Sequence, residues 1–335
     1  MDGLFLPKGY ISKLSLKETQ KAIKTTKDTF QNTFAKYLKL DRVTAPVIVT
    51  SDSGINDDLS GVERKVTFDM LSQSGQAEVV QSLAKWKRLA LDRYGYLPGE
   101  GIYTDMSAIR RDDAVDSTHS IYVDQWDWER VINDSNRTED FLKGVVRIIV
   151  AALADTKDKV NFAFPQLELT MERNVFFITS QELLDLYPDL SSKEREDKIA
   201  KEKGTVFIMK IGHELSNGEP HDLRAPDYDD WDLNGDLIVW NEILGCSFEL
   251  SSMGIRVNAD SLALQLKKAN AEDRLRFPYH KRIIDGTLPL TIGGGIGQSR
   301  MCMFMLEKAH IGEVQVSIWP EEMIKLCEKH GIVLL

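Results

Sequence analysis

This chain of 335 residues has few cysteines, no long apolar run and no charged leader followed by an apolar segment. Its cysteines, Cys246, Cys302 and Cys327, are odd in number and lack metal-ligand pair spacing, which argues against a disulfide framework or a cysteine zinc site. We expect them to be reduced, buried thiols. No run is long enough to span a membrane, and the sequence predicts a cytoplasmic protein.

Positive charge is also scarce. The chain has 42 Lys and Arg against 52 Asp and Glu, a net charge of −10 and a pI near 5.2. This balance argues against non-specific binding to nucleic acid or to an anionic membrane, although it leaves room for a local basic site. Hydrophobic residues make up 42% and charged residues 28%, which is ordinary for a globular protein of one large or two small domains.

The segment TIGGGIGQSR at 291–300 is the densest local signal. Its glycines expose the backbone before an apolar run at 301–306 that predicts a buried helix. A helix start of this kind can bind an anion, and Arg300 could contact a phosphate there. The segment lacks the Gly-Lys-Ser/Thr of a P-loop and the spacing of a dinucleotide fingerprint. On the glycines alone, a tight strand-to-helix packing turn is an equal alternative.

Periodicity predicts the main elements. Residues 15–18 have capping-box spacing and precede a long amphipathic helix. Further helices are expected at 82–90, 136–158, 180–187, 191–203, 262–270 and 272–284. Strands are expected at 45–50, 62–68, 77–81, 120–126, 175–179, 205–211, 236–240 and 246–256. Because they do not alternate strictly, we predict an α+β fold with a mainly antiparallel β-sheet flanked by helices.

Four polar clusters have both a functional and a structural interpretation. DDLSG at 57–61 is typical of a solvated turn. The cations at 85, 87 and 88 suggest a solvated helix face. Arg110 precedes a hairpin whose return strand places Gln125 and Asp127 on one face, which could hold a phosphate beside an amino group or form a cross-strand ion pair. Asp236 and Glu249 stand on strands and could bind Mg²⁺ with a nucleotide, or form ion pairs with arginines such as Arg224 or Arg256.

Six segments together resemble the asparagine synthetase A family, the ammonia-dependent aspartate–ammonia ligases. They are DDLSG (57–61), SLAKWK (82–87), YVDQWDWE (122–129), RAPDYDDW (224–231), ELSSMGIR (249–256) and GGGIGQSR (293–300). The match extends over the whole chain. It implies a fold like the catalytic core of class II aminoacyl-tRNA synthetases, in a single catalytic domain over 1–335 whose region 1–40 packs on the sheet. It also implies a homodimer that binds neither nucleic acid nor membrane.

The resemblance implies that aspartate and Mg-ATP form β-aspartyl-AMP and pyrophosphate, and that ammonia then releases AMP and asparagine. Catalysis is assigned to Asp57, Arg110, Gln125 and Arg300. Binding of aspartate or asparagine is assigned to Ser82, Lys87, Asp127, Asp229, Ser251 and Arg256. Nucleotide binding is assigned to Arg110, Asp113, Asp236, Glu249, Gly295 and Arg300, with Asp236 and Glu249 on the metal.

Two departures and three alternatives accompany this interpretation. Asp113 stands where the family has Glu, which weakens its assigned adenine contact, and the link between residues 231 and 234 is short, which suggests a reduced flap. An aspartyl- or asparaginyl-tRNA synthetase would carry an anticodon-binding domain. A silent paralogue that binds aspartate or AMP would not need both Arg110 and Arg300. A glutamine-dependent enzyme would need a cysteine at position 2, so free ammonia is the expected nitrogen donor.

Overall fold

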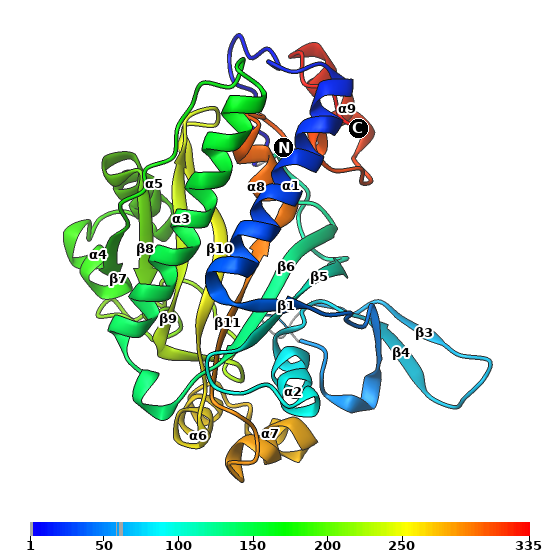
Figure 1. Ribbon diagram of the computed structural model, residues 1–335, viewed down its shortest axis with the longest axis vertical. Coiled ribbons are helices and arrows are strands. Elements are labelled where there is room, and N and C mark those ends of the chain that lie inside the picture. The colour runs from blue at the N-terminus through cyan, green and yellow to red at the C-terminus, as the bar shows by residue number, and fades with distance from the viewer. Residues whose placement is uncertain (1–2, 58, 60–62) are drawn as a thin grey trace.

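The structure is a computed structural model that describes residues 3–57, 59 and 63–335 (Figure 1). Its α-helices are α1 Leu16–Leu38, α2 Ala84–Tyr94, α3 Glu139–Ala163, α4 Ser180–Leu186, α5 Ser192–Lys203, α6 Ala259–Lys268, α7 Pro278–Ile284, α8 Gln298–Met305 and α9 Glu321–Lys329. Its strands are β1 Leu40–Arg42, β2 Ile48–Thr50, β3 Thr67–Asp69, β4 Gln76–Val79, β5 Gly101–Ile109, β6 Tyr122–Val131, β7 Phe176–Thr179, β8 Thr205–Met209, β9 Asp229–Asn241, β10 Cys246–Arg256 and β11 Thr291–Gly297. Short 3₁₀ turns are η1 Ser51–Ser53, η2 Asp134–Asn136, η3 Glu272–Arg276 and η4 Ile311–Glu313.

A large sheet organises the fold. Its strand order in the described residues is β1-β5-β6-β11-β10-β9-β8-β7. The inner pairs are all antiparallel, whereas β1 with β5 and β7 with β8 are parallel. The mainly antiparallel sheet predicted from the sequence is therefore observed, with parallel pairs added at its two ends. The last strand in sequence, β11, lies at the centre.

Helices α1 and α3 lie side by side across one face of this sheet (Figure 1). Helix α1 begins as predicted, because the Ser15 hydroxyl accepts the Glu18 N–H while the Glu18 carboxylate accepts the Ser15 N–H. Its buried Phe30 and Phe34 rings contact Trp126 and Trp128 of β6. Even-numbered residues of this part of β6 therefore face the helices, which leaves Gln125 and Asp127 for the other face.

The cations of α2 are inside the protein, so the predicted solvated basic face is wrong. Lys85, Lys87 and Arg88 are each no more than 2% exposed, while Trp86 is only half-buried. Each cation has a buried acceptor: Lys85 pairs with Asp227, and Arg88 donates to main-chain carbonyls. Because a buried charge is costly without such partners, α2 is tied firmly to the segments that supply them.

Strand β9 also differs from expectation. It runs without interruption from Asp229 to Asn241, whereas the sequence suggested that a strand began at Asp236 after a short flap. The additional residues pair with the far end of β10, where Asp229 is opposite Arg256. The link is short because it is part of the strand, and Asp229 is thereby fixed on the sheet.

A second, small sheet has the order β2-β4-β3 and projects from the body (Figure 1). The strand predicted at 62–68 is shorter than expected and lies at Thr67–Asp69. Residues 58 and 60–62, which include part of the DDLSG segment, lie outside the described residues. Among the described helices, none has both the length and the apolar character of a membrane-spanning segment.

Candidate active site

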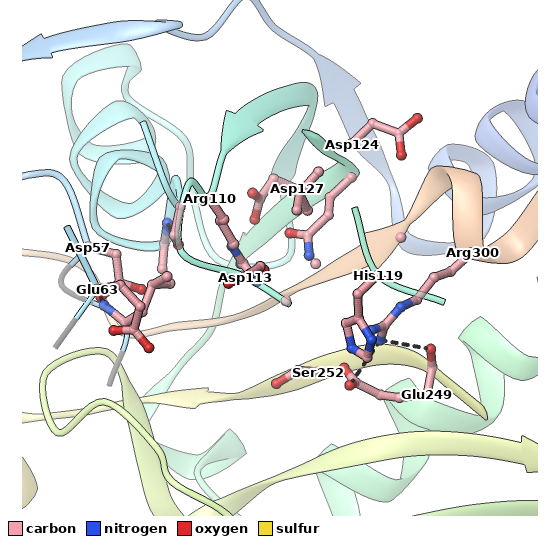
Figure 2. Close-up of a pocket in the computed structure, with 18 of the residues that line it drawn as sticks. Asp57, Glu63, Arg110, Asp113, His119, Asp124, Asp127, Glu249, Ser252 and Arg300 are labelled. Carbon is pink, nitrogen blue, oxygen red and sulfur yellow. Dashed lines mark hydrogen bonds and ion pairs between the residues drawn. The ribbon is translucent and has the colours of Figure 1, made fainter. Parts of the chain in front are cut away.

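A cavity of about 940 Å³ opens on the face of the sheet that carries Gln125 and Asp127. Its walls come from β6, β10 and β11, the turn after β5, the segment before β9 and the start of α2. Arginines and carboxylates predominate in this lining (Figure 2). A volume of this size can hold a ligand larger than an amino acid, and the charges select a ligand that is itself charged.

The glycine segment does not form a loop at a helix start. Residues 293–297 belong to β11; the backbone of 293–296 is paired on both sides, with β6 and with β10, and Gly297 is paired with β6. The predicted cradle of free N–H groups at these glycines is therefore wrong. The apolar run after them does form the predicted buried helix, α8.

The glycines instead leave room for the side chains of neighbouring strands. A Cβ at Gly293 would lie 2.7 Å from Glu129 Oε2 and 2.8 Å from Arg256 Nη2. A Cβ at Gly295 would overlap the amide of Gln125 and lie 3.0 Å from its Cδ. Both distances are shorter than ordinary van der Waals contacts, so polar groups occupy the space that the missing side chains leave.

Sheet register orders the site along its length. At one end, Arg256 of β10 is paired with Asp229 of β9. In the middle, Ser252 is opposite both Asp236 and Gly295, and Gly295 is opposite Asp127. At the other end, Arg300 follows β11 and approaches Glu249 (Figure 2).

The Arg256 end is a closed network of buried charges. The Arg256 guanidinium donates from Nε and Nη2 to Glu129 Oε2, both at 3.1 Å, and from Nη1 to Asp229 Oδ1. Thr291 donates to the other Glu129 oxygen at 2.7 Å. Burial alone would lower the pKa of Arg256, but Glu129 and Asp229 more than offset it and raise the pKa. Glu129 thus fixes Arg256, a role that the sequence prediction missed although Glu129 alternates with Gln125 and Asp127.

Lys87 reaches the centre of the site from α2. Its ammonium donates to Asp127 Oδ1 and, at 3.0 Å, to the carbonyl of Gly294. Burial lowers the pKa of Lys87, against the opposing effect of Asp127. Ser82 also lines the cavity, as predicted. Ser251 does not: its hydroxyl donates to the Gly295 carbonyl, which leaves Ser252 as the serine of β10 that faces the cavity.

Several cavity-lining side chains have a buried polar atom without a hydrogen-bond partner among the described residues, and Arg110 and Asp57 are two of them. Arg110 Nε is buried without a hydrogen-bond partner among the described residues, and so is Asp57 Oδ2. Asp57 is 2% exposed, so this first residue of the predicted solvated turn is buried, and burial raises its pKa. The cross-strand ion pair considered for Arg110 is not formed among the described residues. A half-buried guanidinium and a buried carboxylate with spare hydrogen-bonding capacity indicate positions for an anion and a cation of a ligand.

The turn that follows Arg110 brings Asp113 to the cavity wall. Burial raises the pKa of Asp113, against the lowering effect of Arg110. The neighbouring Asp112 also lines the cavity, but it is paired with Arg64. Asp113 therefore faces the cavity as the nucleotide assignment requires.

Two arginine–carboxylate pairs occupy the rest of the site, Arg224 with Asp236 at its middle and Arg300 with Glu249 at its other end. Arg300 Nη1 is 3.2 Å from Glu249 Oε2, and Arg224 Nη2 is 2.6 Å from Asp236 Oδ1. Burial would raise the pKa of Glu249, but Arg300 and then Arg224 lower it on balance. The ion pair considered for Asp236 in the sequence is therefore present, with Arg224 as its partner. Both carboxylates are bound by arginines in this state.

A β-bulge decides which residues of β10 face the cavity. The pairing with β9 shifts by one residue between Glu249 and Ser251. Without a bulge, Glu249 and Ser252 would point to opposite faces, because they are an odd number of residues apart. Both line the cavity (Figure 2). Arg224 lines it as well. Sequence alternation carries no signal for the bulge, so Ser252 was not assigned to the site. Arg224 lies before β9 and was considered only as an ion-pair partner.

Asp236 and Glu249 were also tested as holders of a divalent metal. Among the described residues, no three His, Cys, Asp or Glu side chains gather as a metal cluster. Mg²⁺ does not require one, since it is commonly held by one or two carboxylates together with substrate phosphates. Glu249 lines the cavity, whereas Asp236 lies behind Arg224 and Ser252. The donor set fits a metal that arrives with a nucleotide.

The start of α8 sets the position of Arg300. Asp124 accepts the Ser299 N–H at 3.0 Å and the Ser299 hydroxyl at 2.8 Å, and it is paired with Lys27 of α1. A carboxylate at this helix N-terminus is favourable electrostatically. Asp124 thus occupies the helix N-terminus at which the sequence suggested a bound anion. By fixing the start of α8, Asp124 orients Arg300 toward Glu249.

Comparisons with known proteins bear on this arrangement. A family described as aspartate-ammonia ligase matches residues 17–331. A protein of Clostridium tetani is 57% identical over 333 residues, and the match covers 99% of this chain and 98% of that protein. A protein of Ruminiclostridium cellulolyticum is 54% identical over 336 residues, and the match covers 100% of each chain. The two relatives are named aspartate–ammonia ligase.

Solved structures are similar at lower identity. An asparaginyl-tRNA synthetase of Entamoeba histolytica, in complex with asparaginyl-adenylate, has a TM-score of 0.63 at 17% identity and covers 89% of this chain and 66% of its own. The corresponding complex from Pyrococcus horikoshii has a TM-score of 0.65 at 14% identity, with 90% of this chain and 70% of that chain covered. At such identity the likeness shows the fold alone.

Proposed function

The chain belongs to the aspartate–ammonia ligase family, and from that premise we propose that it synthesises L-asparagine from L-aspartate, ammonia and ATP through β-aspartyl-AMP. The family predicted from six sequence segments is confirmed. The observation that carries the proposal is the pair of unsatisfied buried groups, Arg110 Nε and Asp57 Oδ2, in one cavity. The proposed reaction needs both kinds of position, a cation for the phosphate that the carboxylate attacks and an acceptor for the N–H of the ammonia that then attacks the acyl carbon.

In the first proposed step, an oxygen of the aspartate side chain attacks the α-phosphorus. An O–P bond forms, the bond to pyrophosphate breaks, and its electron pair leaves with pyrophosphate. Arg110 and Arg300 would hold the phosphate oxygens, and Gln125 would orient the attacking carboxylate. Fixed guanidiniums stabilise the developing charge with little reorganisation. Mg²⁺ bound with ATP would add Lewis-acid stabilisation. Of the two residues predicted to hold it, Glu249 lines the cavity, whereas Asp236 lies behind Arg224 and would fix that arginine instead.

The second proposed step forms the amide. Ammonia attacks the acyl carbon, the C–O bond to AMP breaks, and one proton must leave the nitrogen. Asp57 is the proposed acceptor for an N–H or for this proton, because its raised pKa makes it a stronger base than an exposed aspartate. Full ammonia-dependent turnover by Asp57→Asn would contradict this role.

The substrate aspartate would occupy the end near Arg256. Its α-carboxylate would bind Lys87, Ser82 and Arg256, and its ammonium would bind Asp127 and Asp229. Lys87 and Arg256 are already paired with those two acids, so the cations and carboxylates form a preorganised frame of alternating charge. Ser251 would support this frame through the Gly295 carbonyl rather than by touching aspartate. The nucleotide would occupy the other end, against Asp113 and Gly295.

Product analysis tests the proposal. The protein is incubated with ATP, aspartate and ammonium, with and without tRNA. Equal amounts of AMP and asparagine without tRNA support the ligase. Amino acid transferred to added tRNA would support a synthetase, which the fold alone allows, and binding of aspartate or AMP without turnover would support a silent paralogue.

A homodimer is also proposed, because the family resemblance implies one. Exposed apolar side chains, among them Leu97, Val316 and Ile318, offer surface that an interface could bury. Sedimentation equilibrium at micromolar concentration should give twice the chain mass of 38.0 kDa. A single species at the mass of one chain would contradict the dimer.

A further inference from the structure

Arg224 is a cavity-lining arginine for which the proposed chemistry has no task. It lies in the segment before β9, and it is partly buried. Its Nη1 donates to the Ser252 hydroxyl at 2.6 Å and its Nη2 donates to Asp236 Oδ1 at 2.6 Å. Its Nε is buried and has no partner among the described residues. A guanidinium has five N–H groups, so three remain for a ligand.

The charge of this arginine is secured by its surroundings. Burial alone would lower the pKa of Arg224, but Asp236 and then Asp229 raise it on balance. The planar group is also fixed in direction, because two of its nitrogens are bound by different strands, β9 and β10. A fixed, permanently charged fork is well suited to a planar carboxylate.

Sheet register places Arg224 at the middle of the site. Its partners Ser252 and Asp236 are opposite each other, at the level of Gly295. Counted along β10 from Ser252, Arg256 is four residues away in one direction and Glu249 is three residues away in the other. At the ordinary rise of a strand, these separations correspond to roughly 13 Å and 10 Å. Arg224 therefore lies between the proposed aspartate end and the proposed nucleotide end.

The proposed reaction has a specific need at this position. The attacking carboxylate and the α-phosphate are both anions, and they must approach to bonding distance. Two like charges this close repel each other strongly unless each is paired. Arg110, on the turn after β5, is available to the phosphate. The attacking carboxylate, which Gln125 would orient, still lacks a cation that neutralises its charge.

We propose that Arg224 binds the side-chain carboxylate of aspartate and thereby distinguishes the substrate aspartate from the product asparagine. This inference rests on the proposed function. Asparagine has the same shape but presents an uncharged amide, whose NH₂ would face the N–H groups of Arg224. The site would then bind the acid in preference to the amide and release its own product. Asp236 and Ser252 become positioning residues that fix the guanidinium.

A comparison of aspartate with asparagine gives a direct test, because the two ligands differ only in the side-chain group that Arg224 is proposed to bind. Binding of each is measured by calorimetry in the presence of Mg²⁺ and a non-hydrolysable ATP analogue, for the unchanged protein and for Arg224→Gln. Loss of a charge-assisted hydrogen bond should weaken aspartate binding about 10- to 100-fold. Asparagine binding should change less than about threefold, the size expected of a neutral contact. Equal weakening of both ligands, or of neither, would overturn the inference.

A second variant keeps the test decisive if Arg224→Gln does not fold. Arg224→Lys retains a positive charge beside Asp236 but removes the planar fork. Aspartate binding should fall by about fivefold or more while asparagine binding stays the same, because an ammonium cannot donate two parallel bonds to a carboxylate. An unchanged ratio of the two affinities in Arg224→Lys would also overturn the inference. Failure of the unchanged protein to form AMP and asparagine would instead overturn the proposed function.

Discussion

A substitution at Gly295 tests most directly whether the glycine strand β11 contributes to catalysis. The three atoms nearest to a Cβ there all belong to the side chain of Gln125: the Cβ would overlap its amide oxygen and lie 3.0 Å from Cδ and 3.4 Å from Nε2. No backbone atom is among these neighbours, and the φ angle of Gly295 is not in the left-handed region. Gly295→Ala should therefore leave the sheet intact, with a change in unfolding free energy within about 1 kcal/mol.

The catalytic effect should be much larger. To accept the methyl group, the Gln125 amide must shift by about 1 Å, and a displacement of that size in an active site can reduce the rate about 100-fold. The assay is aspartate-dependent ATP–pyrophosphate exchange, measured alongside a urea unfolding curve. Near-normal exchange by Gly295→Ala would refute the assignment of Gln125 to the reacting centre.

Two controls separate this effect from a general weakening of the sheet. A Cβ at Gly294 would lie 2.5 Å from Met253 Cβ and 2.6 Å from the Ser252 carbonyl, so Gly294→Ala should lose about 1–3 kcal/mol of stability through overpacking. In a Gln125→Ala background, Gly295→Ala should add no further loss of exchange, because the side chain it displaces is gone. An undiminished loss in that background would show that Gly295 acts by another route.

Three further predictions concern other parts of the site and its support. Arg300→Ala should abolish exchange and leave the melting temperature nearly unchanged, because its partner Glu249 is partly exposed; near-normal exchange would contradict the phosphate assignment. Glu129→Gln breaks a fully buried ion pair with Arg256 and should reduce the unfolding free energy in urea by about 3–5 kcal/mol; a loss below about 1 kcal/mol would contradict it. Burial lowers the pKa of His310 to about 4, so the unfolded chain binds a proton near pH 6.5 that the folded chain does not. Stability should fall by up to about 3 kcal/mol as the pH falls from 6.5 to 4, and His310→Asn should show a smaller fall in thermal melts; equal slopes would contradict the shift.

Local signals in the sequence predicted local structure well. Helix α1 begins at its capping box because Ser15 and Glu18 satisfy each other's backbone, which requires no tertiary information. Alternation in β6 placed Gln125 and Asp127 on one face, and the structure brings both to the cavity. Each of these features depends on residues within one turn or one strand, so the pattern is complete in the sequence itself.

Features that depend on distant strands could not be predicted in this way. The glycines of β11 resemble a loop until β6 and β10 pair with them and fill their space with Glu129, Arg256 and Gln125. Lys85 and Lys87 resemble a solvated face because their buried acceptors lie far away in the sequence. In each case the decisive partner comes from another element, so composition and spacing contain no trace of it.

Candidate site residues came mainly from the family resemblance, and the structure brings most of them to one cavity. Those it leaves off the wall are Ser251, which supports Gly295 from behind, and Asp236, which supports Arg224. A bulge in β10 causes the difference at Ser251, since it exchanges the serine that faces the cavity. Their roles, like those of the lining residues, remain predictions that the variants above would test.

The central claim is that the side-chain carboxylate of aspartate attacks the α-phosphate of ATP, and an isotope transfer tests it most directly. Aspartate labelled with ¹⁸O in its side-chain carboxylate is incubated with the protein, ATP and ammonium, and the products are separated for mass spectrometry. The account predicts one ¹⁸O in each AMP and none in pyrophosphate, because cleavage of β-aspartyl-AMP leaves a carboxylate oxygen on phosphorus. Label found in inorganic phosphate or pyrophosphate, with unlabelled AMP or ADP, would contradict it.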